Sequence, residues 1–155
     1  DQSMASNGND IGDIIHVTIK TLDLEATEKF YTEVLQMKIG PRPDLGVPGL
    51  WLDFKGTQVH ILAGEAALDG DGEFTPGSGA FDHVALSASN YDKMKKTVAD
   101  FGCEYRENNI QGFDLWQLFV KDPSDVMYEL NFTVSEEPEG SAGPDPANQY
   151  IPGKF

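Results

Sequence analysis

The sequence predicts an α+β protein made of two tandem modules, each with a strand, a helix and about three further strands. Two observations carry this prediction. All three histidines and one glutamate recur at matching places: His16 and His83 open similar strand-like segments, and His60 and Glu129 lie in a second similar pair. A glycine-rich stretch, residues 64–79, separates the two copies. Because one such module cannot cover both faces of its sheet, we expect the two to pair.

The first module is predicted at residues 14–63. It opens with IIHVTIK, in which apolar and polar residues alternate as in a strand that carries His16 on one face. Asp23 can cap the next helix, which ends at Gly40. After the loop PRPDLGVPG, the segment LWLDFKGTQVHILA predicts two strands joined by a tight turn at Lys55–Gly56.

The second module, predicted at residues 80–134, repeats this order. FDHVALSA is typical of a strand, and NYDKMKKTVADFG of a helix capped by Asn90 and stopped by Gly102. CEYREN predicts another strand. LWQLFVKDPSDVMYELNF predicts a hairpin whose turn contains Asp122 and Pro123.

The remaining segments lack a core pattern. Residues 1–13 are polar and predicted to be disordered, and residues 64–79 form a linker that would let the modules rearrange. Residues 135–155 predict an irregular C-terminal tail, rich in proline, glycine and glutamate, whose Tyr150 and Phe155 could dock on a neighbour.

Composition restricts the function. The chain has 26 acidic and 11 basic residues and a net charge of -15, which argues against binding to nucleic acid. No apolar run approaches the roughly 18 residues of a membrane span, and the start of the chain does not resemble a signal peptide, so we expect a cytoplasmic protein. The single cysteine, Cys103, excludes an intramolecular disulfide and a cysteine-based metal cage.

The order and spacing of these segments resemble the vicinal oxygen chelate superfamily, which includes glyoxalase I and the extradiol dioxygenases. The resemblance rests on HVTIKTLDLEATEKFYTEVLQMKIG, on HVALSA, and on VKDPSDVMYELNF, in which an Asp-Pro turn precedes a metal-binding glutamate in the family. It implies a curved mixed-sheet, barrel-like cleft built from both modules.

The resemblance also implies one divalent metal, with His16, His60, His83 and Glu129 as ligands. Imidazoles and a carboxylate without a thiolate suit Zn, Ni, Co, Fe or Mn equally. Gln58 lies on the same strand face as His60 and is an alternative ligand, because glutamine occupies this position in some relatives.

The implied activity is glyoxalase-like lyase or isomerase chemistry, in which the metal chelates two adjacent oxygens of a small substrate. Glyoxalase I draws one glutamate from each module, whereas this chain has His60 in place of the first, so Glu129 and His60 are the candidate catalytic groups. An Fe(II) dioxygenase using His16, His83 and Glu129, or a binding protein without turnover, remains an alternative.

Four further residues are candidates for contacts with the substrate. Arg42 and Arg106, the only arginines, could clamp a carboxylate or phosphate. Trp51 and Trp116 lie at comparable places in the two modules and could line the cleft. We expect a homodimer, with the metal bound within one chain or across two.

Overall fold

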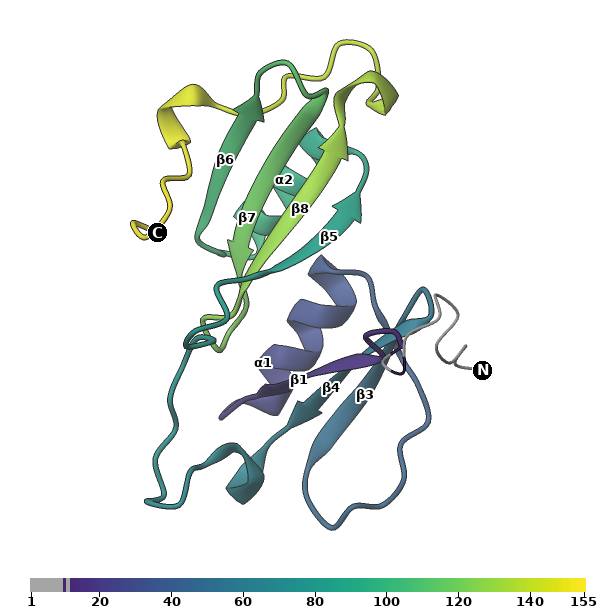
Figure 1. The fold of residues 1–155 in the computed structure, drawn as a ribbon, viewed down its shortest axis with the longest axis vertical. Coiled ribbons are helices and arrows are strands. Elements are labelled where there is room, and N and C mark those ends of the chain that lie inside the picture. Colours follow the sequence, from purple (N-terminus) through teal and green to yellow (C-terminus); the bar gives the residue numbers. More distant parts are fainter. Residues whose placement is uncertain (1–9, 11) are drawn as a thin grey trace. The chain divides into compact units, whose positions relative to one another are not determined.

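The computed structural model describes residues 10 and 12–155, so most of the predicted disordered segment 1–13 lies outside the described residues. The chain divides into two compact units, with the boundary between Thr75 and Pro76. Each unit contains one helix-bearing segment and a four-stranded mixed sheet, with strand orders β1-β4-β3-β2 and β5-β8-β7-β6 (Figure 1). The predicted α+β fold of two strand–helix–three-strand modules is therefore confirmed.

The first unit places the predicted elements in order. Its strands are β1 (His16–Lys20), β2 (Lys38–Ile39), β3 (Gly49–Phe54) and β4 (Thr57–Leu62). The β3–β4 turn has positive φ at both Lys55 and Gly56, as a two-residue hairpin turn requires. A 3-10 turn, Gly64–Ala67, follows β4.

The helix of the first unit begins as predicted and ends differently. Asp23 caps α1 (Leu24–Lys29) by accepting a hydrogen bond from the amide of Ala26 at 3.0 Å. The chain then continues as one π-helical turn, Phe30–Val34, rather than as a regular α-helix. Fully buried side chains from this turn and from the sheet form the core of the unit, namely Phe30, Tyr31, Val34, Leu52 and Ile61.

The second unit comprises β5 (Val84–Ala88), α2 (Tyr91–Asp100), β6 (Tyr105–Ile110), β7 (Leu115–Lys121) and β8 (Met127–Thr133). Helix α2 covers one face of the sheet (Figure 1). On that face, Tyr91 makes edge-to-face contacts with Trp116 and Phe132. The opposite face of this sheet carries Phe119, Glu129 and Asn131. We call it the open face of the second unit.

Asn90 occupies the N-cap position of α2, as predicted, but its side chain does not cap the helix. Asn90 has a left-handed backbone, with φ of 64°, and its side chain makes no capping hydrogen bond. The carboxylate of Glu137 instead accepts hydrogen bonds from the amides of Asn90 and Tyr91. A residue from the predicted irregular tail therefore stabilises the start of the helix.

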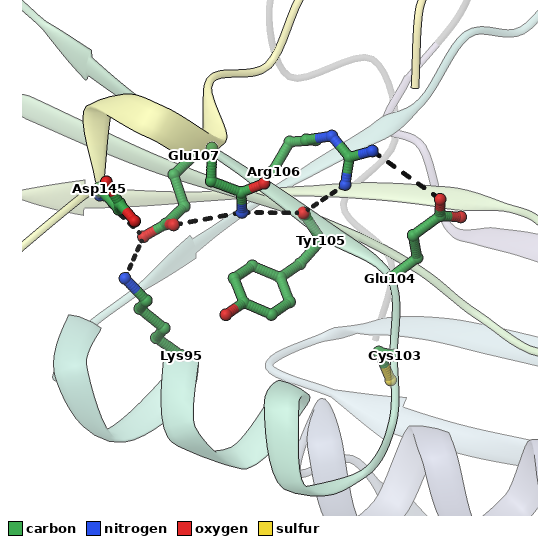
Figure 2. A pocket seen from close by; sticks show the side chains of 8 residues that line it. Lys95, Cys103, Glu104, Tyr105, Arg106, Glu107 and Asp145 are labelled. Atoms are coloured by element: carbon green, nitrogen blue, oxygen red, sulfur yellow. Dashed lines mark hydrogen bonds and ion pairs between the residues drawn. The ribbon is translucent and has the colours of Figure 1, made fainter.

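The rest of the C-terminal segment also lies on the second unit. It contains two short 3-10 turns, Val134–Glu136 and Pro146–Asn148. The second of these lies beside β6, at a pocket of about 410 Å³ (Figure 2). Burial raises the pKa of the Cys103 thiol at this pocket, which favours the thiol over the thiolate. In the described part of the chain, no helix is long and apolar enough to cross a membrane.

Candidate functional site

In the first unit, the candidate residues share one face of the sheet. The parallel pairing of β1 with β4 sets His16 opposite Gln58 and Thr18 opposite His60. The antiparallel pairing of β3 with β4 sets Trp51 opposite His60. Residues paired across strands project to the same face, and alternate residues of one strand share it. The structure thus brings His16, Gln58, His60 and Trp51 together.

The rings of these residues form a stack with His60 in the middle. The His60 ring lies 4.1 Å from that of Trp51, at an angle of 3°, and 3.9 Å from that of His16, at 18°. Gln58 donates a hydrogen bond from its amide nitrogen to Asp53 at 3.0 Å, so its oxygen faces His60 Nε2 at 2.8 Å. His60 Nε2 is therefore the protonated nitrogen, and Nδ1 of the neutral ring carries the lone pair.

Arg42 lies close to the same face. Its Nη2 donates a hydrogen bond to the Val47 carbonyl at 3.1 Å. A Cβ atom on Gly49 would come within 2.8 Å of that nitrogen, so the missing side chain of Gly49 makes room for the guanidinium. Within the described residues, the buried Nε of Arg42 has no hydrogen-bond partner. Arg42 thus adds a positive charge beside His60.

This environment makes the stability of the first unit depend on pH. Burial, then the neighbouring His16 and Arg42, lower the pKa of His60 below its ordinary value of 6.5. As the pH falls below about 6.5, the unfolded chain takes up a proton at His60 before the folded chain does. The contribution of the neutral His60 to stability should therefore be complete above about pH 6.5 and decrease as the pH falls below that value.

We expect the metal-free protein to show this loss in urea unfolding measured from about pH 7 to about pH 5. A His60→Gln variant, which has no imidazole to protonate, should lose less of its free energy of unfolding over the same range. Equal losses in both proteins would contradict the prediction.

In the second unit, His83 and Glu129 are in direct contact. His83 Nε2 lies 3.0 Å from Glu129 Oε1, and the side chains are 31% and 14% exposed. His83 Nδ1 lies 2.7 Å from Asp82 Oδ1. A carboxylate bonded to one ring nitrogen fixes the orientation of the other, an arrangement frequent among histidines that bind metals. His83 and Glu129 are thus arranged as two metal ligands would be, with Asp82 orienting the imidazole.

A row of amide side chains orients the other oxygen of Glu129. Asn131 donates to Glu129 Oε2 at 2.8 Å, Gln117 donates to Asn131 at 3.1 Å, and Asn108 to Gln117 at 3.4 Å. Because a carboxylate only accepts hydrogen bonds, it sets the direction of every bond in the row. The sequence pattern gave no sign of these three amides.

The registers of the two sheets show which positions correspond. In the first module, His16 lies two residues before Thr18, and Thr18 pairs with His60. In the second module, His83 lies two residues before Ala85, and Ala85 pairs with Glu129. His60 therefore corresponds to Glu129, and Gln58 corresponds to an apolar residue. This geometry favours His60 over Gln58 as the ligand, while Gln58 bonds to the His60 ring.

The same registers separate the two tryptophans. Trp51 lies opposite His60, and the residue opposite Glu129 is Phe119, whose ring makes an edge contact with His83 at 6.1 Å. Trp116 lies on the other face of its sheet, with its ring 5.4 Å from Tyr91. Phe119 is thus the counterpart of Trp51, and Trp116 is not brought together with Glu129.

Arg106 lies opposite Phe119 in the pairing of β6 with β7. Its Nη1 donates to the Tyr105 carbonyl at 2.9 Å, and its Nη2 lies 3.9 Å from a Glu104 oxygen (Figure 2). The guanidinium carbon also lies 5.0 Å from the centre of the Phe155 ring. Arg106 is therefore near the open face, but it already has intramolecular partners.

The possible metal donors occur as two pairs, His16 with His60 and His83 with Glu129. Two imidazoles, or an imidazole and a carboxylate, suit a borderline divalent cation. The 3.0 Å distance between His83 Nε2 and Glu129 Oε1 would also allow both atoms to bind the same metal ion. Across the part of the chain that the structure describes, no group of three or more His, Cys, Asp or Glu side chains is placed to hold a metal ion.

Comparison with known proteins gives one family and several related folds. Residues 13–130 match the model of the Glyoxalase/Bleomycin resistance protein/Dioxygenase superfamily. No curated protein matches the chain. Among solved structures, a glyoxalase family protein from Bacillus anthracis is 22% identical, with a TM-score of 0.64 over 81% of this chain and 98% of that one.

Two further structures have the same fold. The fosfomycin resistance protein FosX from Listeria monocytogenes is 15% identical, with a TM-score of 0.63 over 79% of this chain and 93% of that one. Lactoylglutathione lyase from Agrobacterium tumefaciens is 14% identical, with a TM-score of 0.58 over 80% and 96%. These identities establish the fold and leave the reaction open.

Proposed function

The chain belongs to the Glyoxalase/Bleomycin resistance protein/Dioxygenase superfamily, and on that premise we propose that it is a divalent-metal-dependent enzyme of glyoxalase-like type. Its substrate would be a small molecule with two adjacent oxygens. The observation that carries the proposal is the contact of His83 Nε2 with Glu129 Oε1 at 3.0 Å, with Asp82 fixing the imidazole.

The proposed ligands are His16, His60, His83 and Glu129, contributed by one chain or by two copies of it. When bound, such a metal acts as a Lewis acid that stabilises an oxyanion. The residues of this chain would carry out the proton transfer. If His60 binds the metal through Nδ1, a Glu129 oxygen would accept a carbon-bound proton; if it does not, its Nδ1, kept neutral near pH 7 by burial, could accept that proton.

Substrate contacts follow from the face that carries His60. Arg42 would bind a carboxylate, phosphate or phosphonate of the substrate, because its positive charge lies beside His60. Trp51 would form an apolar wall there, although its ring is already stacked on His60. These contacts favour a small anionic substrate and lyase or isomerase chemistry.

One observation favours the dioxygenase as second candidate. His60 Nε2 already bonds to Gln58 at 2.8 Å, and the ring is stacked on both sides. If His60 stays in that stack, the donors left are His16, His83 and Glu129, the two-histidine, one-carboxylate set of non-haem Fe(II) oxygenases. Oxygen consumption with catechols in the presence of Fe(II) would identify this activity.

Metal binding can be followed by tryptophan fluorescence. We expect apo-protein titrated with Co²⁺ or Ni²⁺ to bind one equivalent and to lose emission from Trp51, because the Trp51 ring lies 4.1 Å from that of His60. A Trp116→Phe variant should keep the signal, and a Trp51→Phe variant should lose it. If no metal binds, the proposed function is wrong.

Activity assays then separate the classes. The metal-loaded protein should be tested for formation of S-lactoylglutathione from methylglyoxal and glutathione, for loss of fosfomycin, and for deuterium uptake into 2-oxoaldehydes. Tight binding of such a compound without turnover would identify a binding protein instead.

A further inference from the structure

The C-terminal strap, residues 134–155, contacts the second unit at helix α2, at the edge of the sheet and on the open face. In Figure 1 it runs from the end of β8 to the side of β6. On the helix side, Glu137 caps α2, and the Asp92 carboxylate accepts hydrogen bonds from the amides of Ala142 and Gly143 at 2.7 and 3.0 Å. A Cβ atom on Gly143 would come within 2.7 Å of Trp116. The strap therefore passes closely over a buried aromatic of the sheet.

At the edge of the sheet, the strap is held by Glu107, which is 1% exposed. The Glu107 carboxylate accepts hydrogen bonds from the Asp145 amide and the Asn148 side chain, both at 3.3 Å, and lies 2.9 Å from Lys95 Nζ (Figure 2). Its backbone carbonyl accepts from the Tyr150 amide at 3.0 Å. These bonds fix the position at which the strap turns toward the open face.

On the open face, the strap places an aromatic ring beside the candidate site. Tyr150 stacks on Phe119 at 3.7 Å and 10°, and it is only 8% exposed. Phe119 lies opposite Glu129 and makes an edge contact with His83. Tyr150 is thus one ring removed from both proposed ligands of this unit.

The hydroxyl of Tyr150 has no partner. Within the described residues it makes no hydrogen bond, whereas the hydroxyl of the fully buried Tyr91 donates to Glu107 at 2.8 Å. Burial, followed by the charges of Asp82 and Glu129, raises the pKa of Tyr150 and keeps the phenol protonated. The hydroxyl is therefore available to donate a hydrogen bond to a ligand or to water.

We propose that Tyr150 is a substrate-binding residue of the open face, held there by the strap, and that its hydroxyl donates a hydrogen bond to an oxyanion of the substrate beside Glu129. The inference rests on the proposed function and adds a residue and a ligand class to it. The same face also carries the charges of Arg106 and Lys121, which lie 5.0 and 4.5 Å from the Phe155 ring centre. A small anion with adjacent oxygens fits this surface.

Oxalate, a dianion with adjacent oxygens, is a suitable probe for titration calorimetry of the metal-loaded, full-length protein. Tyr150→Phe keeps the ring and its stacking and removes only the hydroxyl. It should bind oxalate about tenfold more weakly, as expected for one lost hydrogen bond to a charged group. Tyr105→Phe removes a hydroxyl from the neighbouring pocket and should leave oxalate affinity unchanged.

Metal affinity and amide exchange at Tyr150 serve as the second readout, since neither should change in Tyr150→Phe if the strap stays in place. Wild-type oxalate affinity in Tyr150→Phe would overturn the inference while leaving the metal site intact. Failure of the wild type to bind metal would instead overturn the proposed function, and the inference with it.

Discussion

Replacing Glu129 with glutamine should lower the affinity for Co²⁺ or Zn²⁺ by about two to three orders of magnitude, because the variant loses the only carboxylate among the proposed ligands. The amide nearly matches the carboxylate in shape, so the fold of the second unit should persist. Glu129 contacts His83 at 3.0 Å and accepts a hydrogen bond from Asn131, and both contacts depend on the carboxylate oxygens of Glu129. Competition with a chromophoric chelator measures the loss.

A graded series tests whether the amide row supports this ligand. Asn131→Ala removes the group that orients Glu129 Oε2, and a change of this kind in the surroundings of a metal site typically costs 10–100-fold in affinity. Gln117→Ala acts one bond further away and should cost less. Glu104→Gln removes a surface carboxylate of the same unit and is the matched control. Wild-type affinity in Glu129→Gln would exclude this residue as a ligand.

The positions of the donors were predictable because they depend on strand alternation. A strand fixes which residues share a face, so a histidine at the start of one strand and a donor in the next are brought together wherever the two strands pair. Pairs His16–His60 and His83–Glu129 follow from that rule. The choice between Gln58 and His60 needed the actual register, since both lie on the same face.

The tryptophan pairing shows where the same reasoning failed. Trp51 and Trp116 lie in corresponding strands, but the β7–β8 connection differs in length from the β3–β4 turn. A shift of an odd number of residues moves a side chain to the other face of a sheet. Trp116 consequently packs on Tyr91, and Phe119 takes the place beside Glu129.

Apart from Tyr150 and Phe155, which pack on the open face, the strap left no pattern in the sequence because hydrogen bonds hold most of it. Its backbone amides donate to the carboxylates of Asp92 and Glu107, and its own Glu137 carboxylate accepts from the amides at the start of α2. Such contacts have no period along the chain, so a segment rich in proline, glycine and glutamate resembles a disordered tail.

Glu107 is the residue on which this arrangement depends, and Glu107→Ala should lower the free energy of unfolding by about 3 kcal/mol. The substitution leaves the buried Tyr91 hydroxyl without its acceptor and Lys95, 29% exposed, without its ion pair. Asp100→Ala breaks an exposed ion pair on the same helix, with side chains 77% and 64% exposed, and should cost less than about 0.5 kcal/mol. Urea unfolding compares the two.

Hydrogen exchange shows whether the loss is local. In Glu107→Ala, the amides of Asp145 and Ala147 should exchange faster than in wild type, while the exchange rates of amides in the middle of β7 and β8 should increase the least, because the strap opens before the sheet. Uniform acceleration throughout the unit would mean that Glu107 supports the core and does not anchor the strap.

The pH dependence of this cluster has a definite sign. Burial alone would lower the pKa of Lys95, but its hydrogen bond to Glu107 and the charge of that carboxylate outweigh burial and raise it above 10.5. A raised pKa means that the folded state holds the proton more tightly than the unfolded one, so the contribution is complete below about 10.5 and is lost as the pH rises through the folded-state value. Wild type should therefore lose more stability than Glu107→Ala above that pH. Equal alkaline losses in both proteins would show that the Lys95–Glu107 pair does not contribute to stability.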